Sequence, residues 1–62
     1  MNQYQMAIEE LALSGSVYVK GSTSTVYRWK RAINEILEHG NYDWRVKADI
    51  KTGVLTAIAA SS

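Results

Sequence analysis

The sequence contains no cysteine and no proline, and only one histidine, among its 62 residues. The absence of cysteine excludes a disulfide framework, a thiolate metal site and a cysteine nucleophile, and it fits a reducing compartment. We therefore expect a cytoplasmic protein. Hydrophobic residues make up 47% of the chain and charged residues 21%, which is ordinary for a folded protein. A chain this short has room for one small domain, residues 1–62.

Long apolar runs are also missing. A membrane-spanning helix needs about 20 consecutive, mostly apolar residues, and the longest apolar stretch, around Thr56, is far shorter. Glu9 and Glu10 stand near the N-terminus, where a signal sequence would be basic. We expect no membrane partner.

Basic residues are absent from both ends of the chain, although the net charge is only +1. The middle segment, residues 20–51, has seven basic and four acidic residues, which leaves +3, whereas residues 1–19 carry −2. Concentrated positive charge favours a polyanion such as DNA, and a solvated surface with no ligand is the alternative. The seven basic residues are Lys20, Arg28, Lys30, Arg31, Arg45, Lys47 and Lys51.

Two segments have apolar residues at helical spacing, which predicts helices over residues 2–13 and 24–39. Gly15 is expected to close the first helix, and Gly40 the second. Hydroxyl side chains between positions 22 and 25 can cap the start of the second helix. The apolar stripes are Tyr4, Ile8 and Leu11 in the first helix, and Val26, Trp29, Ile33, Ile36 and Leu37 in the second.

The remaining apolar segments are typical of strands. Residues 17–19 predict a short strand between the helices, and strict alternation from Tyr42 to Ile50 predicts a strand with one buried face. A loop at residues 51–53 then leads into a return strand over 54–60, which completes a β-hairpin.

The register of this hairpin stays open at the level of sequence. A three-residue loop pairs Ile50 with Val54 and turns Ile58 inward. A four-residue loop instead turns inward Leu55, Ala57 and Ala59.

The order of elements indicates an α+β domain: helix, short strand, helix and β-hairpin, with two helices covering a small antiparallel sheet. Both tryptophans lie on apolar faces, and we expect them to pack in the core. The expected core consists of Ile8, Leu11, Val17, Val19, Val26, Trp29, Ile33, Ile36, Leu37, Trp44, Val46, Ile50 and Ile58.

The string from Ser24 to Arg31 combines hydroxyl residues at a helix start with arginines one turn later, a pattern suited to phosphate and base edges. It resembles the recognition helix of helix-turn-helix proteins, particularly the compact winged-helix type of phage excisionases and related regulators. That resemblance implies a winged-helix-like fold and a small DNA-binding protein that regulates transcription in a phage or mobile element. It places the hairpin as a wing on duplex DNA. The implied nucleic-acid-binding residues are Ser24, Thr25, Tyr27, Arg28, Lys30 and Arg31 of the helix, and Arg45, Lys47 and Lys51 of the hairpin.

Other readings of the same residues remain open. Arg28 and Arg31 are spaced to pair with Glu35 on a solvated helix. Glu35 and His39 give only two potential metal ligands, and no nucleophile with a base can be assigned. We expect no enzyme and no cofactor.

The alternative function is a small phage-type interaction module that binds and inhibits a host enzyme without binding nucleic acid. The return strand, residues 54–60, has no charge and no proline, so we expect it to form an unprotected sheet edge. A partner or a second copy could pair with it. We expect a homodimer, formed through this edge or through the exposed side of the first helix.

Overall fold

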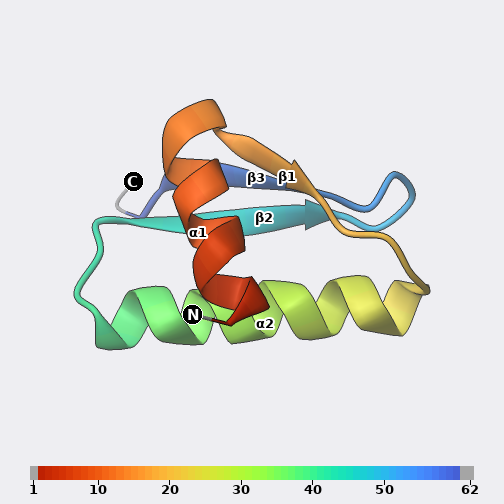
Figure 1. Ribbon diagram of the computed structural model, residues 1–62, viewed down its shortest axis with the longest axis horizontal. Helices are drawn as coiled ribbons and strands as arrows, with labels where there is room; N and C mark the ends of the chain where they lie inside the picture. The colour runs from red at the N-terminus through yellow and green to blue at the C-terminus, as the bar shows by residue number, and fades with distance from the viewer. Residues whose placement is uncertain (1, 61–62) are drawn as a thin grey trace.

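The computed structural model describes residues 2–60, which fold into two helices and a three-stranded antiparallel sheet (Figure 1). This arrangement confirms the predicted α+β class. Met1, Ser61 and Ser62, which complete the expected domain, lie outside the described residues. The elements are α1 (Gln3–Ser14), β1 (Ser16–Tyr18), α2 (Thr23–His39), β2 (Trp44–Asp49) and β3 (Val54–Ala59).

Both helices begin and end close to the predicted positions. The Asn2 side chain caps α1 by accepting from the Gln5 amide at 2.9 Å, and Gly15 ends the helix with φ of 85°. Ser22 caps α2, so this helix begins at Thr23, one residue earlier than predicted. Gly40 follows its last turn and donates to the Ile36 carbonyl at 3.0 Å.

The sheet has the strand order β1-β3-β2, so β3 is the central strand. The prediction of an exposed edge at residues 54–60 is therefore wrong. β1 pairs with the side of β3 that the hairpin leaves open, and the Ala57 amide donates to the Gly15 carbonyl at 2.9 Å. Pairing on both sides satisfies the backbone N–H and C=O groups of β3. This strand has no charged side chain that would protect an exposed edge.

The hairpin has the four-residue register. Asp49 pairs with Val54 across a loop of residues 50–53, which turns Leu55 into the core and Ile58 towards the outer face beside Arg45. Ile58 is only half-buried, so its place in the expected core is wrong. The Asp49 carboxylate stabilises this loop by accepting from the amides of residues 51 and 52 at 3.1 and 3.3 Å.

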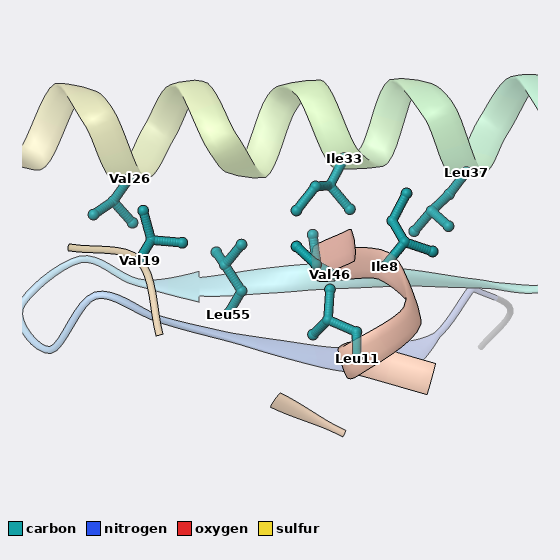
Figure 2. Close-up of a cluster of buried hydrophobic side chains, with 9 residues drawn as sticks. Ile8, Leu11, Val19, Val26, Ile33, Leu37, Val46 and Leu55 are labelled. Atoms are coloured by element: carbon teal, nitrogen blue, oxygen red, sulfur yellow. The ribbon is translucent and has the colours of Figure 1, made fainter. Parts of the chain in front are cut away.

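Both helices cover the same face of the sheet (Figure 1). Figure 2 shows Val26, Ile33 and Leu37 pointing from α2 towards the strands, where they meet Val46 and Leu55. Five expected core residues pack against this cluster but are only half-buried, and two hydrophobic members of the cluster were not in the expected core. The first group is Val17, Trp29, Ile36, Trp44 and Ile50, and the second is Ala7 and Leu55.

The tryptophans pack at the margin of the core. The Trp29 ring meets the Tyr4 ring of α1 edge to face at 4.8 Å, and the Trp44 ring meets the Tyr42 ring at 5.7 Å. Trp29 therefore joins α2 to α1 instead of filling the centre, which belongs to the smaller Ile33 and Leu37.

Candidate nucleic-acid interface

The α2 helix is fixed to the free edge of β2 by one side chain. Asn34 donates from Nδ2 to the Val46 carbonyl at 3.2 Å, and its Oδ1 accepts from the Val46 amide at 2.8 Å. The side-chain amide thus occupies the place that a neighbouring strand would take. The sequence pattern assigned no role to Asn34. The one indication in the sequence is that asparagine, a polar residue that forms helices poorly, stands in the interior of a predicted helix.

This contact brings basic residues from distant parts of the chain to one side of the molecule. At about 100° per residue, residues three, four or seven positions from Asn34 lie near the side of α2 that faces β2. That side carries Tyr27, Lys30 and Arg31. Arg45 and Lys47 lie on either side of Val46 in β2 and are exposed.

The two elements and Ile58 of β3 line an open hollow of about 300 Å³ that has no acidic residue in its lining. Half of the side chains around it are cationic. The hollow is lined by Lys30, Asn34, Arg45, Val46, Lys47 and Ile58, and we refer to it as the cationic hollow.

A second hollow of about 590 Å³ adjoins it along α2 and shares Lys30 and Asn34. Its other lining residues are Tyr27, Arg31, Glu35, Glu38 and His39, so the basic half of the helix gives way to an acidic half. The basic part of this region and the cationic hollow form a continuous area. We call it the α2–β2 surface, made of Tyr27, Lys30, Arg31, Asn34, Arg45 and Lys47.

The structure therefore places five of the nine predicted binding residues on one surface and leaves the other four outside it. Thr25 is half-buried, with its hydroxyl 3.1 Å from that of Ser22, and Ser24 also bonds to Ser22, at 3.0 Å. Both therefore belong to the helix cap. Arg28 is exposed on the side of α2 that faces away from the sheet, and Lys51 lies in the hairpin loop.

The alternative pairing of the helix charges is not formed. Within residues 2–60, no ion pair with an N···O distance of 4.0 Å or less joins Arg28 or Arg31 to Glu35. The same part of the chain contains no cluster of three or more His, Cys, Asp or Glu side chains that could hold a metal ion. Among its helices, neither is long and apolar enough to span a membrane.

Fold and surface together define a small α+β domain with a basic face that crosses a sheet edge. No family model, no curated protein and no solved structure matches the chain.

Proposed function

We propose that the protein binds duplex DNA through the α2–β2 surface. The observation that carries this proposal is the cationic hollow, which Lys30 of α2 lines together with Arg45 and Lys47 of β2 and which has no acidic residue in its lining. Cations from a helix and a strand are suited to DNA phosphates, because neutralising each phosphate releases condensed counterions.

The geometry of α2 supports a division of roles along this surface. The helix has 17 residues and is about 25 Å long at about 1.5 Å per residue, and the major groove of DNA admits one α-helix. Arg31 is exposed within this surface, so it can reach base edges, and the exposed Arg28 extends the contact beyond the surface along the outer side of α2. Lys30, Arg45 and Lys47 then contact the phosphates that flank the groove. Glu35 restricts this contact to the first half of the helix.

A salt titration of a labelled duplex tests the proposal. We expect measurable affinity that falls steeply with salt. Arg31→Ala should cost about 1–3 kcal/mol if Arg31 reads a base, and Lys47→Ala should lower the salt slope by about one. Lys20→Ala is the matched control, because it removes an equal charge from an exposed loop outside the surface. Absence of binding at low salt would overturn the proposal.

A protein-interaction module remains the second candidate, although β3 no longer offers it an edge. The observation that favours it lies on α1, where Met6 is 61% and Leu13 is 89% exposed. These side chains are seven residues apart and so share one side of the helix. With DNA binding we also propose a regulatory role in transcription and a cytoplasmic location.

A further inference from the structure

We infer that the cationic hollow is a seat for one phosphoryl group, held between α2 and β2. The inference rests on the same surface as the proposed DNA binding and deepens it by naming the chemical group and its position. It also makes a separate claim, because binding of a phosphoryl group in this hollow can be measured without DNA.

The charge around the hollow is matched to an anion with more than one negative charge. Lys30, Arg45 and Lys47 carry three positive charges, and no lining residue is acidic. Folding thus brings like charges together, and an anion between them relieves their mutual repulsion. Ile58 contributes an apolar wall, beside which electrostatic attraction is screened less than in open water.

The donors around the hollow favour a phosphoryl group over a carboxylate. Lysine offers an ammonium as a point charge, and arginine offers several N–H groups in a planar fork that matches phosphate oxygens. Three cationic groups from two elements can contact different oxygens of a tetrahedral anion. A carboxylate, with two oxygens in one plane, satisfies fewer of them.

The Asn34 side chain adds a fixed donor to the lining of the hollow. Its Nδ2 has two hydrogens, and one of them is donated to the Val46 carbonyl. Its Oδ1 accepts from the Val46 backbone amide, so the side-chain amide of Asn34 cannot rotate freely. The second N–H is thereby fixed in orientation before any ligand arrives, which lowers the entropy lost on binding.

An NMR titration with inorganic phosphate, at constant ionic strength set with sodium chloride, tests the seat. We expect saturable shifts of the Asn34 side-chain NH₂ and the Val46 amide. Lys47→Gln and Arg45→Gln alter exposed residues and should keep the fold, which a dispersed amide spectrum verifies. Each should weaken phosphate binding by about tenfold, whereas the matched control Lys20→Gln should leave it unchanged. Shifts that rise linearly without saturation, or equal weakening in the control, would overturn the inference.

Duplexes with 5′-phosphate and 5′-hydroxyl ends then identify the source of the phosphoryl group. Equal affinities that Lys47→Gln weakens alike support an internal backbone phosphate. A preference for the 5′-phosphate that Lys47→Gln abolishes supports a terminal one. Saturable phosphate binding without duplex binding supports the seat and overturns the proposed function. Duplex binding without a saturable phosphate response overturns the seat and leaves the proposed function standing.

Discussion

The Asn34 side chain satisfies both backbone groups that Val46 directs towards α2. Val46 is almost fully buried with Asn34 in place, and its amide and carbonyl lose these two hydrogen bonds if Asn34 is removed. A buried polar group left without a partner costs about 1–3 kcal/mol. The same amide keeps the middle of the β2 edge from pairing with another chain. One residue thus serves both the stability of the sheet and the shape of the cationic hollow.

Asn34→Ala should therefore lower the free energy of unfolding by about 1–3 kcal/mol. Alanine favours helix more than asparagine by some tenths of a kcal/mol, so the net loss lies towards the lower end of this range. Urea denaturation followed by tryptophan fluorescence gives the value. Arg31→Ala, at an exposed position of the same helix, is the control and should change stability by less than about 0.5 kcal/mol. Equal stability of the wild type and Asn34→Ala would contradict the role assigned to this amide.

The β3 strand determines how the elements combine, because it pairs with β1 on one side and with β2 on the other. Its register places Leu55, which is fully buried, against the helices and turns Ile58 outward. The four-residue loop fixes this register, since a shift of one residue would turn every side chain of β3 to the opposite face of the sheet.

Leu55→Ala should accordingly destabilise the protein by about 2–5 kcal/mol, which is enough to unfold a large fraction of so small a domain. Ile58→Ala removes a similar amount of apolar side chain from a half-buried, outward position and should cost clearly less. Thermal unfolding of the two variants under identical conditions gives the order. A larger loss for Ile58→Ala would show that the hairpin has the three-residue register.

Local sequence patterns predicted the elements well because their causes are local. The end of α1 at Gly15 and the alternation around Val46 depend on residues within a few positions of one another. The pairing of β1 with β3 and the choice of register depend on contacts between distant segments, which periodicity does not encode. The Asp49 side chain was the available signal for the register, because aspartate at the start of a turn bonds to amides two or three residues later.

The candidate site, too, could be predicted from the sequence only in part. Its residue types could be predicted, since seven cations in one segment are visible in the sequence. Their grouping could not, because Lys30 lines the same hollow as Arg45 and Lys47 through packing of α2 against β2, which includes the contact between Asn34 and Val46. Thr25 was assigned to DNA from its place at a helix start, but the same position allows its hydroxyl to bond to Ser22.

Charge is divided unevenly over the whole molecule, and this division affects self-association. The outer side of α1 carries the exposed Met6 and Leu13 with Glu9 and Glu10 between them, whereas the basic residues gather on the α2–β2 surface. A symmetric dimer through α1 buries the two apolar side chains. It also brings like carboxylates together across the two-fold axis.

We therefore expect any dimer through α1 to strengthen as salt rises, because salt screens repulsion between the glutamates. DNA binding should weaken over the same range, since it depends on counterion release. Sedimentation equilibrium across a concentration series at low and high salt measures the first effect. Leu13→Ser should abolish the dimer, and Ala12→Ser, at an exposed neighbouring position, should retain it. A monomer at every protein and salt concentration would remove self-association through α1, and a dimer that salt dissociates would place the contact on oppositely charged surfaces instead.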